Sequence, residues 1–298
     1  MWNRIWSFRI SYLFIAPFLS CFVLFIVVPI FMAIGLSFTY YNGIEPPRFI
    51  GWDNFQYLIS QDLLFLKHAL PNTFKFAVIV GPGGYAMSFL LAWLISRLGR
   101  RLQKWVALAM YTPSLTAGVA MTIIWQPLLS GDRIGYLNSL LLKLGWIDVP
   151  KLWVTDPALL MKSMIAVTLW SSMGVGFLAM LAGILNVDPV LYEAGRIDGI
   201  RNSFQELWHI TIPCMKPQML FGAVMAVVTT FKAGAIGVEL SGVNPTPEYA
   251  GHLIVNHIND YGFIRFEMGY AAAVSVFLLL MMYAANKLSW GLFGSKGE

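Results

Sequence analysis

The sequence predicts an all-α membrane protein with six transmembrane helices. Of its 298 residues, 58% are hydrophobic and only 12% are charged, and its mean hydropathy is +0.67. This composition lies outside the range of ordinary soluble domains. A helix crosses a hydrocarbon core of about 30 Å with roughly 20 apolar residues, because lipid offers no partner to free backbone groups. The apolar runs are continuous and not alternating, which disfavours a transmembrane β-barrel.

Six apolar segments have the required length. They are residues 11–39, 72–96, 105–128, 159–186, 218–240 and 269–293. Arg4 and Arg9 precede the first segment as they would in a signal peptide, but its apolar run continues past any plausible cleavage point, so we interpret it as a retained membrane anchor. No internal repeat or linker is evident, and the chain, 1–298, is interpreted as a single membrane domain.

Basic residues between the segments predict the orientation. The compact run RLGRRLQK, residues 97–104, separates the second and third segments, and short basic loops stay cytoplasmic. The loops assigned to the outer side balance their basic residues with acidic ones. Both termini, including Arg4 and Lys296, and the loop 187–217 are therefore expected in the cytoplasm. The net charge of +5 follows from this bias and requires no nucleic acid.

The loop 187–217 is unusually polar for a chain of this composition. Asp188-Pro189 is typical of a helix N-cap followed by proline at the first helical position, and Gly199 is typical of a helix end. A second helix is expected from about Ile200 to near Pro213. The side chains expected on one face of this helix are Phe204, Leu207 and Trp208.

The loop resembles the cytoplasmic EAA loop of binding-protein-dependent ATP-binding cassette (ABC) transporter permeases. The residues that carry the resemblance are Glu193-Ala194-Gly195, Gly199 and Ile210-Thr211-Ile212-Pro213. Two departures make it a variant. Gly195 stands where alanine is usual, and the stretch between Gly199 and Ile210 is one residue longer than the commonest spacing.

Other fragments are similar to the carbohydrate-importing subgroup of that family. They are Phe49–Phe55, Leu58, Asp62, Phe65, Asn72-Thr73, Trp125, Gly135, Leu137-Asn138 and Gly269–Ala272. Each fragment alone is weak, but their order relative to the six segments matches the family. The resemblance implies the type I ABC importer permease fold in a bacterial inner membrane.

The resemblance also implies the partners. A second, similar permease would complete the pathway, two ABC ATPases would supply the power stroke, and an extracytoplasmic binding protein would deliver a sugar or oligosaccharide. The sequence contains no Gly-x-x-x-x-Gly-Lys-Ser/Thr motif, so ATP and Mg²⁺ are expected on the partner ATPase and no cofactor on this chain. The residues that would couple the loop to the ATPase are Glu193, Ala194, Gly195, Asp198, Gly199, Ile210 and Pro213.

Polar residues inside the apolar segments are the candidates for the solute pathway. Lys232 within a membrane segment requires a partner, a wet cavity or a position near the surface, and Glu239 lies seven residues on, two helical turns along the same face. Hydroxyl and aromatic residues suit a sugar, yet they also serve helix packing in membranes. The candidates of this kind are Thr112, Ser114, Trp170, Ser171 and Thr229, with Thr116 nearby.

The last outer loop carries His252, His257 and Asp260. The spacing of the histidines places them on different faces of a helix, so we expect no metal site. A docking surface for the binding protein is favoured instead, with Tyr249, Tyr261 and Phe263 as exposed contacts. Cys21 and Cys214 fall in different environments, which argues against a disulfide.

Three other functions were weighed. A membrane-embedded enzyme would need a catalytic motif such as His-Glu-x-x-His or Gly-x-Ser-x-Gly, and neither is present, so no enzyme is predicted. An ion-coupled secondary transporter usually shows inverted repeats and intramembrane carboxylates. An ABC permease for another small solute, such as an amino acid or phosphate, remains the main alternative. The identity of the solute and of the second permease is beyond the sequence.

Overall fold

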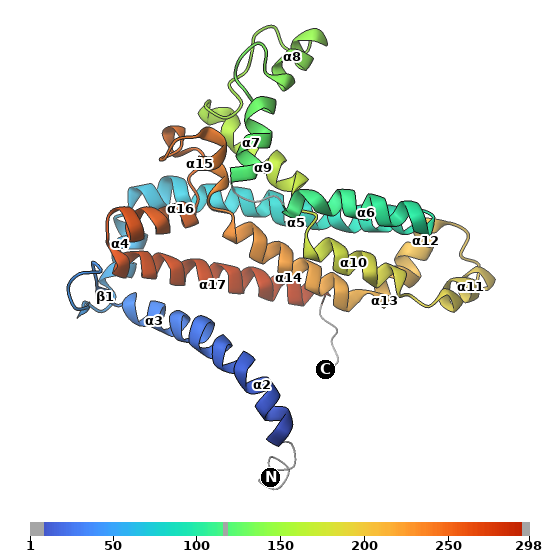
Figure 1. Cartoon of the computed structure of the whole chain (residues 1–298), viewed down its shortest axis with the longest axis horizontal. Helices are drawn as coiled ribbons and strands as arrows, with labels where there is room; N and C mark the ends of the chain where they lie inside the picture. The colour runs from blue at the N-terminus through green and yellow to red at the C-terminus, as the bar shows by residue number, and fades with distance from the viewer. Residues whose placement is uncertain (1–8, 116–118, 294–298) are drawn as a thin grey trace. The chain divides into compact units, whose positions relative to one another are not determined.

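The computed structural model describes residues 9–115 and 119–293, which are mostly helical (Figure 1). Arg4, Thr116 and Lys296 lie outside these residues. The described chain forms two compact units, residues 9–63 with 257–279 and residues 64–256 with 280–293. The elements of the first unit are α2 (Arg9–Phe22), η1 (Val23–Val27), α3 (Val28–Leu36), β1 (Thr39–Tyr40), β2 (Arg48–Phe49), α4 (Asp53–Ser60), η5 (Asp260–Ile264) and the first part of α17 (Met268–Phe293).

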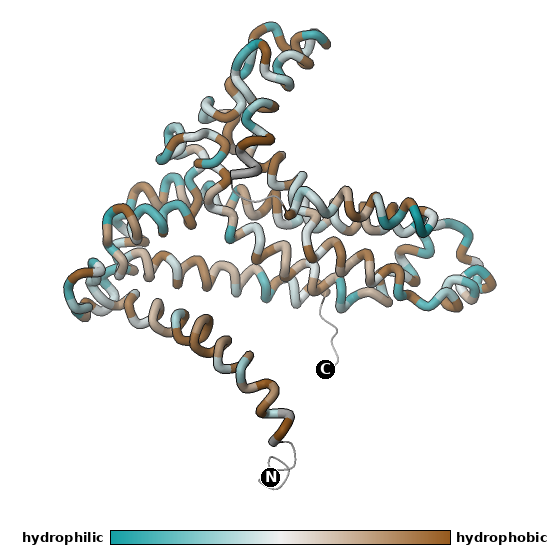
Figure 2. The backbone as a smooth tube through the Cα atoms, viewed as in Figure 1, coloured by the Kyte–Doolittle hydropathy of each residue, from teal (hydrophilic) through white to brown (hydrophobic). Residues whose placement is uncertain are grey.

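The first unit begins with a long apolar helix made of α2, η1 and α3. Its part Tyr12–Leu36 has a mean hydropathy of 2.7 and buries no residue in the isolated chain, and it is hydrophobic along most of its length in Figure 2. A helix that is apolar on all sides requires lipid or another chain around it. It ends at Leu36 and not at residue 39, because the chain there enters a short hairpin in which Thr39 pairs with Phe49.

Asn54 fastens this hairpin to α4. Its buried side-chain amide donates to the carbonyl oxygens of Ser37 at 2.9 Å and Thr39 at 3.0 Å. A carbonyl at the end of a helix or strand needs such a partner when it is buried. The asparagine of the Phe49–Phe55 fragment thus has a structural role.

A buried polar cluster joins the two sequence segments of the first unit. The Asp62 carboxylate accepts a hydrogen bond from the Tyr270 hydroxyl at 2.6 Å and bonds to His257 Nε2 at 2.8 Å. The Tyr261 ring packs against both His257 and Tyr270. Burial, followed by the charge of Asp62, raises the pKa of the Tyr261 phenol above its ordinary value. The expectation that Tyr261 is an exposed docking residue is therefore wrong, because its ring fills this core.

The second unit contains most of the helices. Its elements are η2 (Phe65–Ala69), α5 (Leu70–Ser96), α6 (Arg100–Leu115), α7 (Val119–Leu128), α8 (Tyr136–Lys143), α9 (Pro157–Trp170), α10 (Val175–Leu185), α11 (Pro189–Ile197), α12 (Ser203–Glu206), η3 (Leu207–Thr211), α13 (Ile212–Cys214), α14 (Lys216–Lys232), α15 (Ile236–Ser241), η4 (Pro247–Tyr249), the first half of α16 (Ile254–Asn259) and the second part of α17.

The centre of the second unit is the group α5, α10 and α14, which pack on one another (Figure 1). Gly176 and Gly222 bring α10 and α14 close together, since a Cβ on Gly176 would lie 3.4 Å from the Gly222 Cα. Small residues at helix contacts are a common solution in membranes, where packing drives association. A cluster of buried side chains including Phe177, Met180 and Met219 surrounds this contact.

Two of the expected helical segments are broken. Residues 159–186 form α9 and α10, separated at Ser171–Gly174, and residues 218–240 form α14 and α15, separated after Lys232. Gly234 lies in the second break, where a Cβ would overlap the Val255 side chain. Lys232 and Glu239 therefore do not share a face of one helix, and that prediction is wrong.

Four helices among the described residues are long and apolar enough to cross a membrane. They are Tyr12–Leu36, Phe65–Ser96, Pro157–Leu185 and Met268–Phe293. A bent pair, Ser203–Cys214 with Lys216–Lys232, adds a fifth if it counts as one span. The expected third segment, 105–128, includes residues 116–118, which are outside the described chain.

Asn138 organises the connection between α7 and α9. Its side-chain nitrogen donates to the carbonyl oxygens of Ser130, Asp132 and Lys151, at 3.0 to 3.2 Å. Its side-chain oxygen accepts from the Lys151 backbone N–H and from the Trp153 indole N–H. This fully buried side chain replaces the regular backbone pairing that the loop lacks.

Candidate functional site

The first helix of the loop 187–217 forms as its sequence predicts. α11 begins after Asp188, whose carboxylate accepts from the Val190 N–H at 2.9 Å, with Pro189 at the start of the helix. The helix ends at Ile197, and the chain leaves it through Gly199 at a φ of +96°. A left-handed backbone after a helix is favoured for glycine, because other residues meet a Cβ clash there.

The second helical segment differs from the prediction. It begins at Ser203 and not at Ile200, because the Asn202 side chain caps it by accepting from the Gln205 N–H at 2.8 Å. It ends at Cys214, next to Pro213, as predicted, and the chain then turns by 81° into α14.

Some motif residues of the loop 187–217 are exposed and others are buried. Glu193, Ala194, Asp198, Gly199 and Pro213 are exposed, whereas Gly195 and Ile210 are buried. A Cβ on Gly195 would lie 2.7 Å from the Ile210 Cδ1 and 3.0 Å from the Ile200 Cδ1. Glycine at this position therefore brings α11 closer to the second helical segment than alanine allows without movement of those side chains.

The loop also exposes large apolar side chains. Ile197 is 87% exposed, Phe204 72% and Trp208 71%, while Leu207, expected on the same face, is buried. Figure 2 shows hydrophobic residues scattered among the hydrophilic ones in α11 and α12. Large apolar side chains exposed among polar ones are available to a partner protein in this loop.

An ion-paired carboxylate that sequence reasoning missed lies behind α11. Glu206 accepts from Arg97 at 3.1 Å and from Arg196 at 3.5 Å. The hydroxyl groups of Tyr192 and Thr211 form a hydrogen bond of 2.9 Å nearby. The three charges were visible in the sequence, but a separation of 109 residues between Arg97 and Glu206 gave no reason to pair them.

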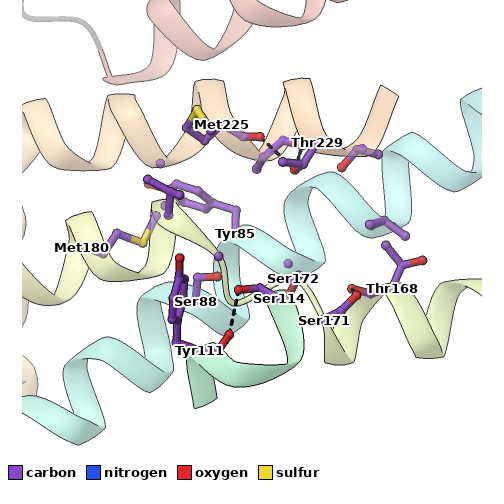
Figure 3. A pocket seen from close by; sticks show the side chains of 18 residues that line it. Tyr85, Ser88, Tyr111, Ser114, Thr168, Ser171, Ser172, Met180, Met225 and Thr229 are labelled. Carbon is purple, nitrogen blue, oxygen red and sulfur yellow. Dashed lines mark hydrogen bonds between the residues drawn. The ribbon is translucent and has the colours of Figure 1, made fainter. Parts of the chain in front are cut away.

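The second unit contains a partly open cavity of about 340 Å³ between α5, α6, α9, α10 and α14. Figure 3 shows Tyr85, Ser88 and Tyr111 directed into it. The lining residues are Val80, Gly84, Tyr85, Ser88, Tyr111, Ser114, Thr168, Ser171, Ser172, Gly174, Val175, Gly176, Met180, Gly222, Met225, Ala226, Thr229 and Thr230. Among these described residues none is charged, and half carry a hydroxyl group.

Three of the predicted pathway residues, Ser114, Ser171 and Thr229, line this cavity. The others, Thr112, Trp170, Lys232 and Glu239, are not among its lining residues. Thr112 and Lys232 are exposed on the isolated chain. The Trp170 ring packs edge-on against Trp125 at 5.3 Å, which is a packing role.

Tyr85, Ser88 and Tyr111 were missed as cavity residues. Tyr85 and Ser88 lie three positions apart in the second apolar segment, hence on one face of α5, and this spacing was the available signal. The Tyr85 hydroxyl is buried without a hydrogen-bond partner in the described structure. A buried hydroxyl next to a cavity is available to a solute.

The predicted exposure of aromatic side chains in the last outer loop is confirmed only in part. Tyr249 is half-buried and Phe263 is exposed. Among the described residues, no group of three or more His, Cys, Asp or Glu side chains is placed to hold a metal ion. Cys21 and Cys214 are both free.

Comparison with known proteins places these features in a family. Residues 84–288 match the family model described as "Binding-protein-dependent transport system inner membrane component". The chain belongs to this family. It is thus an inner membrane component of a transport system, in a family of transport permeases.

Two relatives of this inner membrane component have names that state a sugar or oligosaccharide. It is 30% identical to the arabinooligosaccharides transport system permease protein AraP of Bacillus subtilis over 96% of this chain and 90% of that protein. It is 28% identical to the lactose transport system permease protein LacF of Rhizobium radiobacter, covering 94% and 92%.

A solved structure has the same fold. A chain of a bacterial ABC transporter involved in the import of the acidic polysaccharide alginate matches with a TM-score of 0.78, 25% identity and 97% coverage of both chains. A second crystal structure of a bacterial alginate ABC transporter contains an alginate pentasaccharide-bound periplasmic protein, and its matching chain has the same TM-score at 22% identity.

Proposed function

We propose that this permease passes a sugar or oligosaccharide across the bacterial inner membrane as part of an ATP-driven importer. The observation that carries the proposal is the cavity of about 340 Å³, lined by hydroxyl and aromatic side chains. Sugars bind through hydrogen bonds to their hydroxyls and through contact of their apolar ring face with aromatic rings. The names of AraP and LacF support the same solute class.

The absence of charge in the cavity favours a saccharide over the alternatives. An amino acid or phosphate carries charge, and moving an unpaired charge into such surroundings is costly. Among the residues described as lining the cavity, none could neutralise it. An ion-coupled carrier would likewise need titratable groups in the pathway.

The proposal includes six membrane spans with both termini in the cytoplasm. Four helices and one bent pair support five spans, and α6 with α7 would supply the sixth. The basic run at residues 97–104 supports the orientation. Under this orientation, the loop 187–217 faces the cytoplasm, and the whole chain acts as one permease domain.

Energy would come from a partner. The exposed residues Glu193, Ala194, Asp198, Gly199 and Pro213, with the buried Gly195 and Ile210 beneath them, are proposed as the ATPase-coupling surface. ATP and Mg²⁺ would bind to the two ATPase subunits and no cofactor to this chain. An extracytoplasmic binding protein would deliver the sugar, as the family description and the alginate complex suggest. A second, similar permease would complete the pathway.

Affinity purification of this chain from its native membrane, followed by mass spectrometry, tests the proposal. Recovery of a homologous permease, a Walker-motif ATPase and a solute-binding protein is expected. The binding protein would then be screened against neutral oligosaccharides, uronates, amino acids and phosphate by isothermal titration. Recovery of the chain alone after gentle extraction would contradict the importer, and a binding protein that takes only amino acids or phosphate would contradict the sugar.

A further inference from the structure

Three helical segments of the second unit meet at one carboxylate. The Glu206 side chain is only 10% exposed, and each of its oxygens contacts a different arginine. Oε2 accepts from Arg97, the residue that caps the C-terminus of α5. Oε1 accepts from Arg196 in the last turn of α11. Glu206 itself belongs to the segment that bends at Met215 into α14.

Arg97 is held in one orientation. Its Nη2 donates to Glu206 and its Nη1 to the Ser203 hydroxyl at 3.2 Å. Its guanidinium also lies 5.5 Å from the centre of the Trp93 ring, and that ring packs against Phe204 at 5.6 Å. A planar group with two directed contacts clamps two helices in a way that a lysine ammonium does not.

The Trp93 and Phe204 rings are in contact across this junction, but a gap lies beside them. A cavity of about 380 Å³ lies among α5, α11 and the segment 203–214, and its lining includes Trp93, Arg97, Arg196 and Glu206. The contact between Gly195 and Ile210 joins α11 to the second helical segment but does not reach α5. The ion-paired carboxylate is therefore a direct bridge across the gap to α5.

One bridged helix, α5, lines the cavity of about 340 Å³, and the bridged segment 203–214 leads into another lining helix, α14. α5 contributes Tyr85 and Ser88, and α14 contributes Thr229. We propose that Glu206 and Arg97 are positioning residues that transmit movement of α11 to the cavity helices. The inference rests on the proposed coupling of α11 to an ATPase. Because a largely buried carboxylate is unfavourable without its arginine, the bridge resists separation, and α5 follows the segment 203–214 when α11 moves.

The test reads the cavity directly and needs no known solute. The complex is purified from its native membrane with Cys21→Ser, Cys214→Ser and Ser171→Cys in this chain, and position 171 is labelled with a small maleimide. Mg·ATP with vanadate, which traps the ATPase closed, is expected to change the labelling rate at least about fivefold. Glu206→Gln and Arg97→Ala should reduce this change to less than about twofold, while the ATPase still copurifies and hydrolyses ATP.

Two further variants sharpen the result. Arg97→Lys keeps the positive charge but loses the planar guanidinium with its two directed contacts. It should give a change in labelling rate between those of the parent and Arg97→Ala. Arg101→Ala removes an exposed arginine from the same basic run and should leave the response intact. An unchanged labelling response in Glu206→Gln and Arg97→Ala would overturn the inference. Loss of the response together with loss of thermal stability or of the bound ATPase would also overturn it, since the bridge would then be only structural. If the proposed function fails, the parent complex itself contains no ATPase and shows no response.

Discussion

Two sets of polar residues behind the family resemblance differ in burial. In the segments assigned to the outer side, Asn54, Asp62 and Asn138 are buried, with hydrogen bonds to distant parts of the same unit. In the loop 187–217, Glu193 and Asp198 are exposed. Motif residues of the first kind stabilise the fold of this chain. Those of the second kind lie outside the buried core, which fits the docking role proposed for them.

Removal of Asp62 should have the largest effect on stability. Asp62→Ala removes the carboxylate that accepts from the buried Tyr270 hydroxyl and bonds to the buried His257, at a cost of about 1 to 3 kcal/mol for each hydrogen bond lost. We expect a marked fall in the unfolding temperature of the detergent-purified chain, measured by fluorescence-detected size exclusion. Asp53→Ala, at an exposed acid of the same segment, is the control. Equal effects at positions 53 and 62 would refute the distinction between the two groups.

Asn138→Ala should have the next largest effect. The substitution deletes five hydrogen bonds in the loop between α7 and α9, and a loss of about 2 to 3 kcal/mol follows from the unpaired groups it leaves. Asn138→Asp keeps the two accepted bonds and loses the three donated ones, so the same thermal assay should place it between the alanine variant and the parent. A stable alanine variant would mean that water replaces the side chain.

Gly199→Val tests whether the turn that ends α11 is needed to couple ATP hydrolysis to uptake. A Cβ at this position meets no atom within 4 Å, so the cost comes from the backbone alone, at about 1 to 2 kcal/mol for a left-handed conformation. Because relief of that strain turns the end of α11, sugar uptake should fall while ATP hydrolysis continues, as measured in membrane vesicles. Gly99→Val, also in open space but without a positive φ, is the matched control. Normal uptake by Gly199→Val would contradict coupling through this turn.

Ile197→Ser should have the smallest effect on stability, within about 0.5 kcal/mol, because the side chain is almost fully exposed. The variant should nevertheless reduce the amount of ATPase that copurifies, as quantified by mass spectrometry. Ile44 is equally exposed in the segment assigned to the outer side. Ile44→Ser should retain the ATPase, and equal retention by both variants would show that exposure in the loop does not mark a docking surface.

Features that depend on neighbouring residues were predictable from the sequence. The Asp188 cap and the Gly199 helix end involve atoms within a few positions, and both are confirmed. Features that depend on remote packing were not. The break after Lys232 accompanies the approach of Val255 to Gly234, and Tyr261 is buried because Asp62 and Tyr270 converge from distant segments.

The cavity shows the same division. Ser114, Ser171 and Thr229 were predicted from residue type. Glu239, chosen on the assumption of a continuous helix with Lys232, lies beyond the break and away from the lining. Residue type indicates which side chains suit a solute. The packing of the five helices determines which of these side chains line the same cavity.

The hydroxyl groups of the cavity have a kinetic consequence. Ser114, Thr168, Ser172 and Thr229 each donate their proton to a carbonyl of their own helix, at 2.7 to 2.9 Å. Toward the cavity these four hydroxyls offer mainly lone pairs, so a sugar there would meet acceptors on them and would find donors on other groups, such as the Tyr85 phenol. A solute that satisfies only part of its hydrogen bonds stays briefly and leaves in either direction as soon as an exit opens. Such a chamber favours turnover over retention, and tight capture is left to the protein that delivers the sugar.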